Sequence, residues 1–197
     1  MKTILIDLDH TLIDTAAFKR HRMAILRRFG VSRRQFEEAH RNIIRGMAVF
    51  HPDAFLDYVF PDPKIRRKVL GEYQKLFGRK KGYNYPGARA FVQKLARKHR
   101  LILLSYGHKQ FQLRKFIQAG FGRFFKYVLI TGNLHKKEDL AAFRKKYGPH
   151  LIMLDDSPHV IAAARALGVK AVKIKKGKKN TAYYAALARR IERLSER

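Results

Sequence analysis

The chain has 197 residues, which is enough for one substantial hydrophobic core and a small insert. Cysteine is absent, which excludes disulfides, thiolate metal sites and cysteine nucleophiles, and no apolar run approaches the ~18 residues that a membrane-spanning helix requires. The 44 Lys and Arg residues outnumber the 15 Asp and Glu residues, and the formal net charge of +29 predicts a surface that attracts polyanions and phosphorylated molecules.

The excess positive charge is distributed along the whole chain. Residues 15–85 contain 17 basic and 6 acidic residues, and the remainder contains 27 and 9. This distribution favours a generally basic surface over a dedicated nucleic-acid groove. The N-terminus leads directly into an apolar strand, without the charged and apolar pattern of a signal sequence, so we expect a cytoplasmic protein with no membrane span.

The first predicted element is a buried strand that runs into two carboxylates. Three apolar residues at 4–6 are typical of a parallel strand covered on both faces, and Asp7 and Asp9 follow at its C-terminal end. Because side chains alternate along a strand, both carboxylates are expected on one face, in the crevice where open α/β sheets bind ligands. They would repel each other unless a divalent metal ion, or a phosphate group with its cationic clamp, lay beside them.

Residues 15–85 are predicted to contain helices and no strand. The periodicity indicates helices at 17–29, 32–46 and 63–77, with a short helical piece after Pro52. The expected boundary residues are the N-caps Ser32 and Asp62 and the helix ends Gly30, Gly46 and Gly78. The apolar faces of these helices predict a small helical bundle, and residues 79–82 and 85–87 are expected to lead back to the main domain.

From residue 87 the chain alternates between helices and strands. The predicted strands are 101–104, 127–131, 151–154 and 169–174, and the predicted helices are 88–99, 108–119, 138–147, 158–167 and 181–194. Such alternation implies right-handed crossovers and a parallel sheet covered on both faces. The expected fold class is therefore α/β, with a Rossmann-like parallel sheet in residues 1–14 and 86–197 and a small all-helical domain in residues 15–85.

Polar residues follow the C-terminal ends of three further predicted strands. Ser105 follows 101–104, Lys136 and Lys137 lie in the loop after 127–131, and Asp155 and Asp156 follow 151–154. A parallel sheet brings these strand ends to the edge that also carries the first two aspartates, so residues far apart in the sequence are expected to converge there.

The four motifs, in this order, resemble those of the haloacid dehalogenase-like (HAD) superfamily of phosphotransferases and hydrolases, and specifically its aspartate-dependent phosphatases. Asp7-Leu-Asp-His-Thr11 matches the first motif and Leu-Ile-Leu-Leu-Ser105 the second. Lys136 or Lys137 supplies the lysine of the third, and Leu-Ile-Met-Leu-Asp-Asp-Ser-Pro158 matches the fourth. By position and helicity alone, residues 15–85 resemble the helical cap that many members insert after the first motif.

The resemblance implies the roles of the two N-terminal aspartates. Asp7 would be the nucleophile that attacks phosphorus and becomes an aspartyl-phosphate. Asp9 would protonate the leaving alcohol and then deprotonate the water that hydrolyses the intermediate.

The resemblance also implies a metal ion and a set of phosphate-binding groups. Mg²⁺ would lie on the Asp7 side chain, the Asp9 backbone carbonyl and Asp156, with Asp155 as a secondary candidate. Ser105 and a lysine would bind the phosphoryl oxygens, with Thr11 beside them. The lysine of the family commonly precedes a proline, but here Glu138 and Asp139 follow the two lysines; the spacing to Phe143 favours Lys137 over Lys136.

The function expected from this resemblance is that of a Mg²⁺-dependent phosphatase acting on a small-molecule phosphate ester such as a sugar phosphate or nucleotide. The net charge motivates two alternatives. One is a phosphatase that acts on nucleic-acid ends, and the other is a basic nucleic-acid-binding protein that keeps the fold to present a basic surface.

Overall fold

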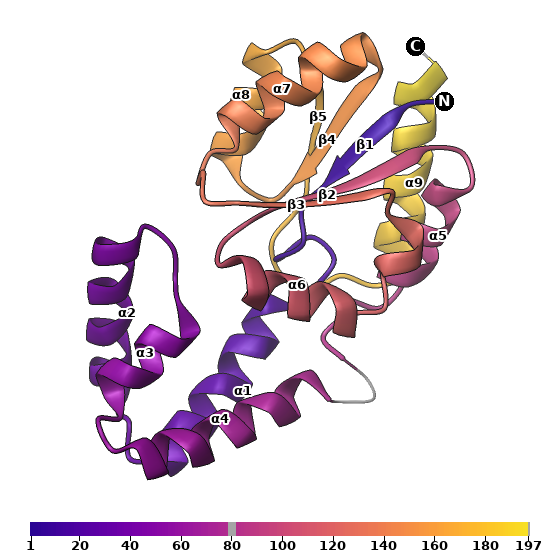
Figure 1. The fold of residues 1–197 in the computed structure, drawn as a ribbon. Helices are drawn as coiled ribbons and strands as arrows, with labels where there is room; N and C mark the ends of the chain where they lie inside the picture. The colour runs from indigo at the N-terminus through magenta and orange to yellow at the C-terminus, as the bar shows by residue number, and fades with distance from the viewer. Residues whose placement is uncertain (79–81, 197) are drawn as a thin grey trace.

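The computed structural model describes residues 1–78 and 82–196, and its centre is a five-stranded parallel sheet (Figure 1). The strands are β1 (Thr3–Ile6), β2 (Arg100–Tyr106), β3 (Tyr127–Thr131), β4 (Leu151–Asp155) and β5 (Lys170–Lys173). Their order in the sheet is β3-β2-β1-β4-β5, so β1 lies in the middle and pairs with both β2 and β4. The predicted parallel α/β architecture is therefore confirmed.

Helices cover both faces of the sheet, as the apolar strands require. Ile4 and Ile6 of β1 pack in the core on one face, together with α5 (Ala88–Ala96) and α9 (Thr181–Glu196). Leu5 points to the opposite face, where α7 (Lys137–Tyr147) and α8 (Pro158–Ala166) pack. All four residues of β1 are buried, so the strand has no solvent-facing side.

The segment between β1 and α5 is helical and has a core of its own (Figure 1). It consists of α1 (Thr15–Arg28), α2 (Arg33–Met47), α3 (Pro52–Val59) and α4 (Pro63–Phe77). Phe18, Phe55 and Tyr73 are among the buried residues of this second cluster. The domain boundaries at 15 and 85 stay predictions, and residues 79–81 of the expected linker lie outside the described residues.

Local sequence signals explain most of the helix boundaries in this segment. The side chain of Ser32 accepts a hydrogen bond from the backbone of Gln35, whose own side chain completes a capping box. The predicted end at Gly46 is wrong, because α2 continues to Met47. The helix closes at Ala48, which has a left-handed backbone (φ 60°) and donates its N–H to the Ile44 carbonyl.

The helix α6 (Lys109–Gln118) lies at the C-terminal edge of the sheet, between the sheet and the helical segment (Figure 1). Two short 3₁₀ turns, η1 (Gly122–Phe124) and η2 (Gly148–His150), complete the fold.

Within the described ranges, no helix combines the length and the apolar character needed to span a bilayer.

Candidate active site

The polar residues of three adjacent strands meet at the C-terminal edge of the sheet. Asp7 directly follows β1, and its backbone N–H continues the ladder by donating to the Leu154 carbonyl over 3.0 Å. Ser105 lies in β2 and Asp155 ends β4, the two neighbours of β1. The order of the strands therefore brings together residues that are separated by up to about 150 positions in the sequence.

Three carboxylates form an acidic cluster at this edge. Oxygen atoms of Asp7, Asp155 and Asp156 all lie within 4.8 Å of one another. Asp7 and Asp155 are buried, and Asp156 is partly buried. Oxygen donors in this number suit a hard divalent cation such as Mg²⁺.

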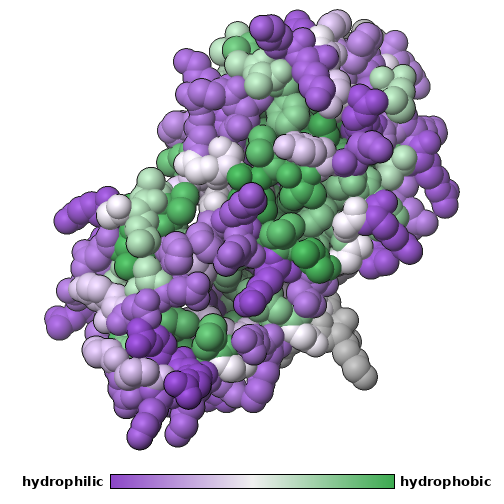
Figure 2. All heavy atoms as spheres, viewed as in Figure 1, coloured by the Kyte–Doolittle hydropathy of each residue, from purple (hydrophilic) through white to green (hydrophobic). Residues whose placement is uncertain are grey.

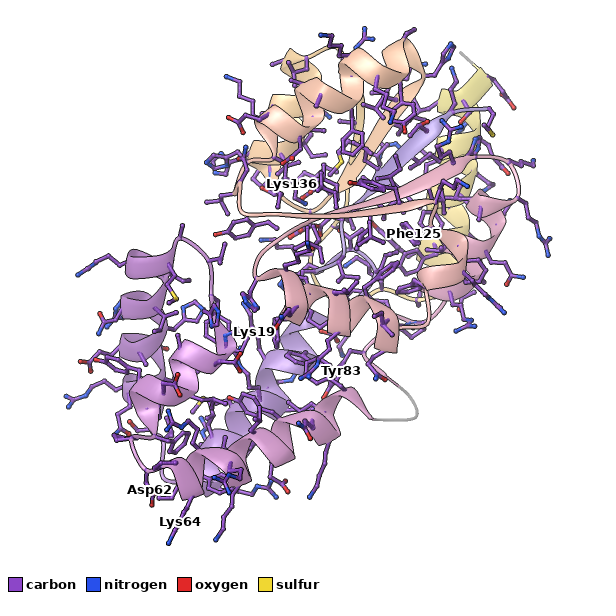
Figure 3. The ribbon with its side chains drawn as sticks, in the orientation of Figure 1. Lys19, Asp62, Lys64, Tyr83, Phe125 and Lys136 are labelled. Carbon is purple, nitrogen blue, oxygen red and sulfur yellow. The ribbon has the colours of Figure 1, made fainter. Side chains whose placement is uncertain are left out.

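Lys136 is the lysine at the centre of the site, which corrects the preference for Lys137. Its Nζ donates to Asp7 Oδ1 at 2.6 Å, to Asp155 Oδ2 at 2.8 Å and to the Leu104 carbonyl at 2.8 Å. The backbone of Lys136 is left-handed (φ 55°) in the loop that joins β3 to α7 (Figure 3), and its side chain is buried. Lys137 begins the helix and is exposed to solvent.

The charges of this cluster do not balance. Burial raises the pKa of the Asp7 carboxyl to about 8, although the Lys136 ammonium opposes the shift and Asp155 adds to it. One buried ammonium faces three carboxylates, and Lys176 reaches Asp156 only from the surface, at 3.4 Å. A divalent cation would neutralise the remaining negative charge, so the residues present fit the metal ion that the resemblance implies.

Asp9 lies in a different environment from Asp7. Because β1 ends at Ile6, the alternation expected along a strand does not extend to these aspartates. Asp9 accepts hydrogen bonds from Lys115 at 2.5 and 2.7 Å, from Gln112 at 2.7 Å and from the Thr15 hydroxyl at 2.5 Å. Burial opposes ionisation, but Lys115 and these hydrogen bonds outweigh it and lower the pKa of Asp9 to about 2. The carboxyl is therefore ionised at neutral pH.

Two buried hydroxyl groups at this edge of the sheet and in the adjoining loop have no hydrogen-bond partner in the part of the chain that the structure describes. Ser105 Oγ and Thr11 Oγ1 are each in residues only 1% exposed, and neither has a partner among the described residues. A buried hydroxyl without a partner is unfavourable, so both groups are available to donate to a bound anion.

The loop after β1 is held by residues that the sequence did not single out. Lys179 donates to the His10 carbonyl at 2.7 Å and lies 4.0 Å from the centre of the Tyr85 ring. The Tyr184 hydroxyl of α9 donates to the Thr11 carbonyl at 2.5 Å. Lys115 and Gln112 were also missed, because no spacing or motif distinguishes them from other polar residues of α6.

The structure thus brings the predicted residues Asp7, Asp155, Asp156, Lys136 and Ser105 to one edge of the sheet, with Asp9 and Thr11 in the adjoining loop. Of the predicted residues, Lys137 alone is exposed to solvent. The relative ranking of Asp156 and Asp155 as metal ligands stays a prediction, because both belong to the cluster.

Comparisons with known proteins agree with this arrangement. A family model for haloacid dehalogenase-like hydrolases matches residues 1–168, whereas no curated protein sequence matches the chain. Among solved structures, a haloacid dehalogenase-like family hydrolase from Xanthomonas campestris has a TM-score of 0.69 at 12% identity, with 100% of this chain and 94% of that chain covered.

Two further solved structures share the fold. YfnB from Bacillus subtilis, bound to magnesium, has a TM-score of 0.63 at 13% identity, with 98% of each chain covered. The L-2-haloacid dehalogenase PA0810 has a TM-score of 0.63 at 19% identity, with 97% of this chain and 99% of that chain covered. The match over residues 1–168, together with the convergence of the four motifs, places this chain in the haloacid dehalogenase-like hydrolase family.

Proposed function

We propose that this protein is a Mg²⁺-dependent phosphatase that hydrolyses a small phosphate monoester through an aspartyl-phosphate on Asp7. The observation that carries the proposal is the buried cluster in which Asp7 shares one lysine with Asp155 and lies beside Asp156. Such a cluster needs a divalent cation for charge balance, and a nucleophilic carboxylate beside cations suits attack on a dianionic phosphate.

In the first step, an oxygen of the Asp7 carboxylate attacks phosphorus, and the bond between phosphorus and the ester oxygen breaks. Beside a bound cation, Asp7 would release to solvent the proton that burial favours on it, so that the carboxylate is ionised for the attack. The Ser105 and Thr11 hydroxyls donate to phosphoryl oxygens, and Lys136 neutralises charge that develops in the transition state. A bound Mg²⁺, held by Asp7, the Asp9 backbone carbonyl and Asp156 or Asp155, would withdraw charge from the phosphoryl group.

Asp9 is the residue proposed to move protons. The leaving alkoxide takes a proton from Asp9, and the water that hydrolyses the aspartyl-phosphate returns one to it. Because the ion pair with Lys115 keeps Asp9 ionised, proton donation requires that these two side chains separate and that Asp9 first takes up a proton from solvent.

The comparisons leave two chemistries open within the family, phosphoryl transfer and dehalogenation. The solved structure of a putative β-phosphoglucomutase from Thermotoga maritima is also similar to this chain, with a TM-score of 0.64 at 14% identity, and PA0810 is a dehalogenase. The phosphatase is favoured because a dehalogenase does not need the second carboxylate, Asp9, and because carbon–halogen cleavage gives no use for a cluster that requires a divalent cation.

The helical segment is proposed to act as a cap. A cavity of about 240 Å³ lies between α1, α2 and α6, next to Asp9. A substrate phosphate at Asp7 would extend its organic part into this cavity, where the helices would exclude bulk water and select the substrate.

The test is the hydrolysis of p-nitrophenyl phosphate with Mg²⁺. Asp7→Asn is expected to lower the rate by about 10⁴-fold or more and Asp9→Asn by about 10²- to 10⁴-fold, and EDTA should abolish turnover. Asp62→Asn is a matched control, because Asp62 is the N-cap of α4, at the far end of the helical segment (Figure 3). Asparagine stabilises a helix N-terminus about as well as aspartate does, so the helix should be unaffected. Turnover that survives EDTA and both site variants would refute the proposal.

Ser105→Ala separates phosphate binding from folding. Its Oγ has no partner among the described residues, so its loss should change the free energy of unfolding by less than about 0.5 kcal/mol. The rate should nevertheless fall about 10²-fold, since a donor to the transition state is removed. An unchanged rate in the folded variant would exclude Ser105 from the phosphate site.

A further inference from the structure

The cavity between the helical segment and the sheet is lined by cations. Lys19 and Arg22 of α1 and Lys115 of α6 line it, together with aromatic side chains that include Phe50 and Phe111. Residues 19 and 22 are three positions apart and therefore lie on one face of the helix. Asp9 is the one carboxylate of the lining, and Lys115 already pairs with it.

Arg22 is a buried cation for which the described part of the chain offers no counterion. Its side chain is 4% exposed, and its guanidinium carbon lies 4.5 Å from the centre of the Phe50 ring and 5.1 Å from that of Phe36. Nε is buried and has no hydrogen-bond partner, and no carboxylate among residues 1–78 and 82–196 pairs with the group. Stacking on two aromatic rings compensates only part of the cost of burying a charge.

Lys19 adds a second positive charge to the same wall. Burial lowers the pKa of its ammonium, and the nearby Arg22 lowers it further, while Asp9 opposes the shift. Lys19 lies on α1 where the helical segment faces the sheet domain (Figure 3). The cavity therefore has a wall with two cations, Lys19 and Arg22, that form no ion pair with a carboxylate among the described residues.

We propose that this wall binds a second anionic group of the substrate, so that the preferred substrate is a small phosphate ester that also carries a carboxylate or a second phosphate. The inference rests on the proposed phosphatase function and adds the chemical class of the ester. Arginine suits this role because its planar fork can donate two parallel hydrogen bonds to a carboxylate or a phosphate. An anion at Arg22 would also satisfy the group that is now buried without a partner.

The experiment compares pairs of esters that differ in the second anion. One pair is 3-phosphoglycerate and glycerol 3-phosphate, and the other is glucose 1,6-bisphosphate and glucose 6-phosphate. The wild-type protein should favour the doubly anionic member of at least one pair by about tenfold or more in kcat/KM, mainly through KM, as expected for one charge-assisted contact. The pair that shows the preference identifies the second anion as carboxylate or phosphate.

The ratio of kcat/KM values within that pair is then measured in Arg22→Met and Lys19→Met. Both variants should reduce the ratio about tenfold, and Lys64→Met should preserve it, because Lys64 is an exposed lysine at the far end of the helical segment (Figure 3). If Arg22 only supported packing, Arg22→Met would lower the thermal midpoint and leave the ratio unchanged. The absence of a preference in the wild type, or a ratio that both variants preserve, would overturn the proposal.

A second measurement separates this inference from the phosphatase itself. Calorimetric titration of Asp7→Asn with the same four esters reports binding without turnover. Tighter binding of a doubly anionic ester, lost in Asp7→Asn/Arg22→Met, would support the anion site even if no ester is hydrolysed. Equal binding of both members of each pair would reject it even if hydrolysis is observed.

Discussion

Lys136 holds three parts of the sheet edge together. Its ammonium contacts the residue after β1, the last residue of β4 and a backbone carbonyl of β2. Burial opposes the charge on Lys136, but Asp7 and Asp155 outweigh it and raise the pKa of the lysine. The side chain therefore has a structural role as well as its proposed catalytic one.

Replacing Lys136 should be damaging, whereas replacing the adjacent Lys137 should have no effect. Lys136→Met leaves two buried carboxylates without a cation, so we expect the metal-free protein to lose about 3–5 kcal/mol of its free energy of unfolding. Hydrolysis of p-nitrophenyl phosphate should fall by about 10²-fold or more. Lys137→Met should change neither the free energy of unfolding nor the rate of hydrolysis beyond the error of measurement, since its side chain is exposed. Equal losses in the two variants would show that neither lysine is the single clamp.

Lys179 should make stability depend on pH above neutrality. Burial lowers its pKa from 10.5 to about 8, although Asp156 and Asp14 oppose the shift; the ammonium also faces the Tyr85 ring and the His10 carbonyl. Between about pH 8 and 10.5 the unfolded chain therefore holds a proton that the folded protein has lost, so the free energy of unfolding should rise with pH in this window.

Chemical denaturation at pH 7.5 and at pH 9.5 tests this expectation. The wild-type protein should gain more stability between the two pH values than Lys179→Met, which has no proton to lose there. The difference between the two proteins isolates this group from tyrosines and other residues that titrate in both. Parallel pH profiles would contradict the shifted pKa.

The sequence indicated which residue types meet at the site but did not determine every position. Asp7, Ser105, Asp155 and Asp156 were predictable because each follows an apolar run that is typical of a buried strand. Lys136 could not be preferred over its neighbour, because its left-handed backbone is fixed by the packing of the loop. The cationic wall was not predictable either, since α1 carries four further basic residues and no local pattern distinguishes Arg22 from them.

At the scale of elements, the N-termini of helices α5 and α9 lie very close to each other. Gly87 precedes α5 with a positive φ of 87°, and a Cβ added there would lie 2.7 Å from the Cα of Thr181, the first residue of α9. Helix α9 carries Tyr184, which donates to the loop that contains Thr11. The position therefore requires glycine for two separate reasons, its backbone conformation and the close approach of Thr181.

Gly87→Ala is expected to destabilise the protein by about 2 kcal/mol or more, because the left-handed conformation alone costs about 1–2 kcal/mol and α9 must also move. Gly46→Ala is the matched control. Gly46 lies within α2, is exposed and has no atom within 4 Å of an added Cβ, so alanine should stabilise the helix by about 0.5–1 kcal/mol. Urea denaturation of both variants measures the change in the free energy of unfolding. If Gly87→Ala is as stable as the wild type, α9 can move aside without a free-energy cost.

The strands and helices were predictable from apolar runs and caps, but several ends were not. The strand predicted at 101–104 extends as β2 to Tyr106, because Ser105 and Tyr106 pair with Ile130 and Thr131 of β3. The helix predicted at 88–99 ends at Ala96, where the chain turns and the N–H groups of Lys98 and His99 bond to the Leu95 carbonyl. Both ends depend on tertiary neighbours that no local pattern specifies.

For the whole molecule, the net charge of +29 should produce polyanion binding that salt abolishes. On the face shown in Figure 2, hydrophilic residues lie on both parts of the molecule, around a hydrophobic area near its centre. The basic residues are spread along the whole chain. Binding of a duplex oligonucleotide, measured by anisotropy, should weaken at least about tenfold between 50 and 200 mM salt.

The same oligonucleotide tests the alternative function. A 5′-phosphorylated end should release phosphate far more slowly than the preferred small ester, because the cavity beside Asp9 is lined for a small anionic group. Faster release from the oligonucleotide, or salt-resistant binding, would instead favour a phosphatase of nucleic-acid ends.

The central position of β1 also affects how the protein is made. Its first partner, β2, begins at Arg100, and its second partner, β4, begins at Leu151. During translation, β1 therefore leaves the ribosome well before either neighbouring strand has been synthesised. The intervening helices can pack on one another in the meantime, since their contacts are local in sequence. A strand that is fully buried in the folded protein must therefore wait unpaired in the nascent chain, which makes this segment a natural target for a chaperone during translation.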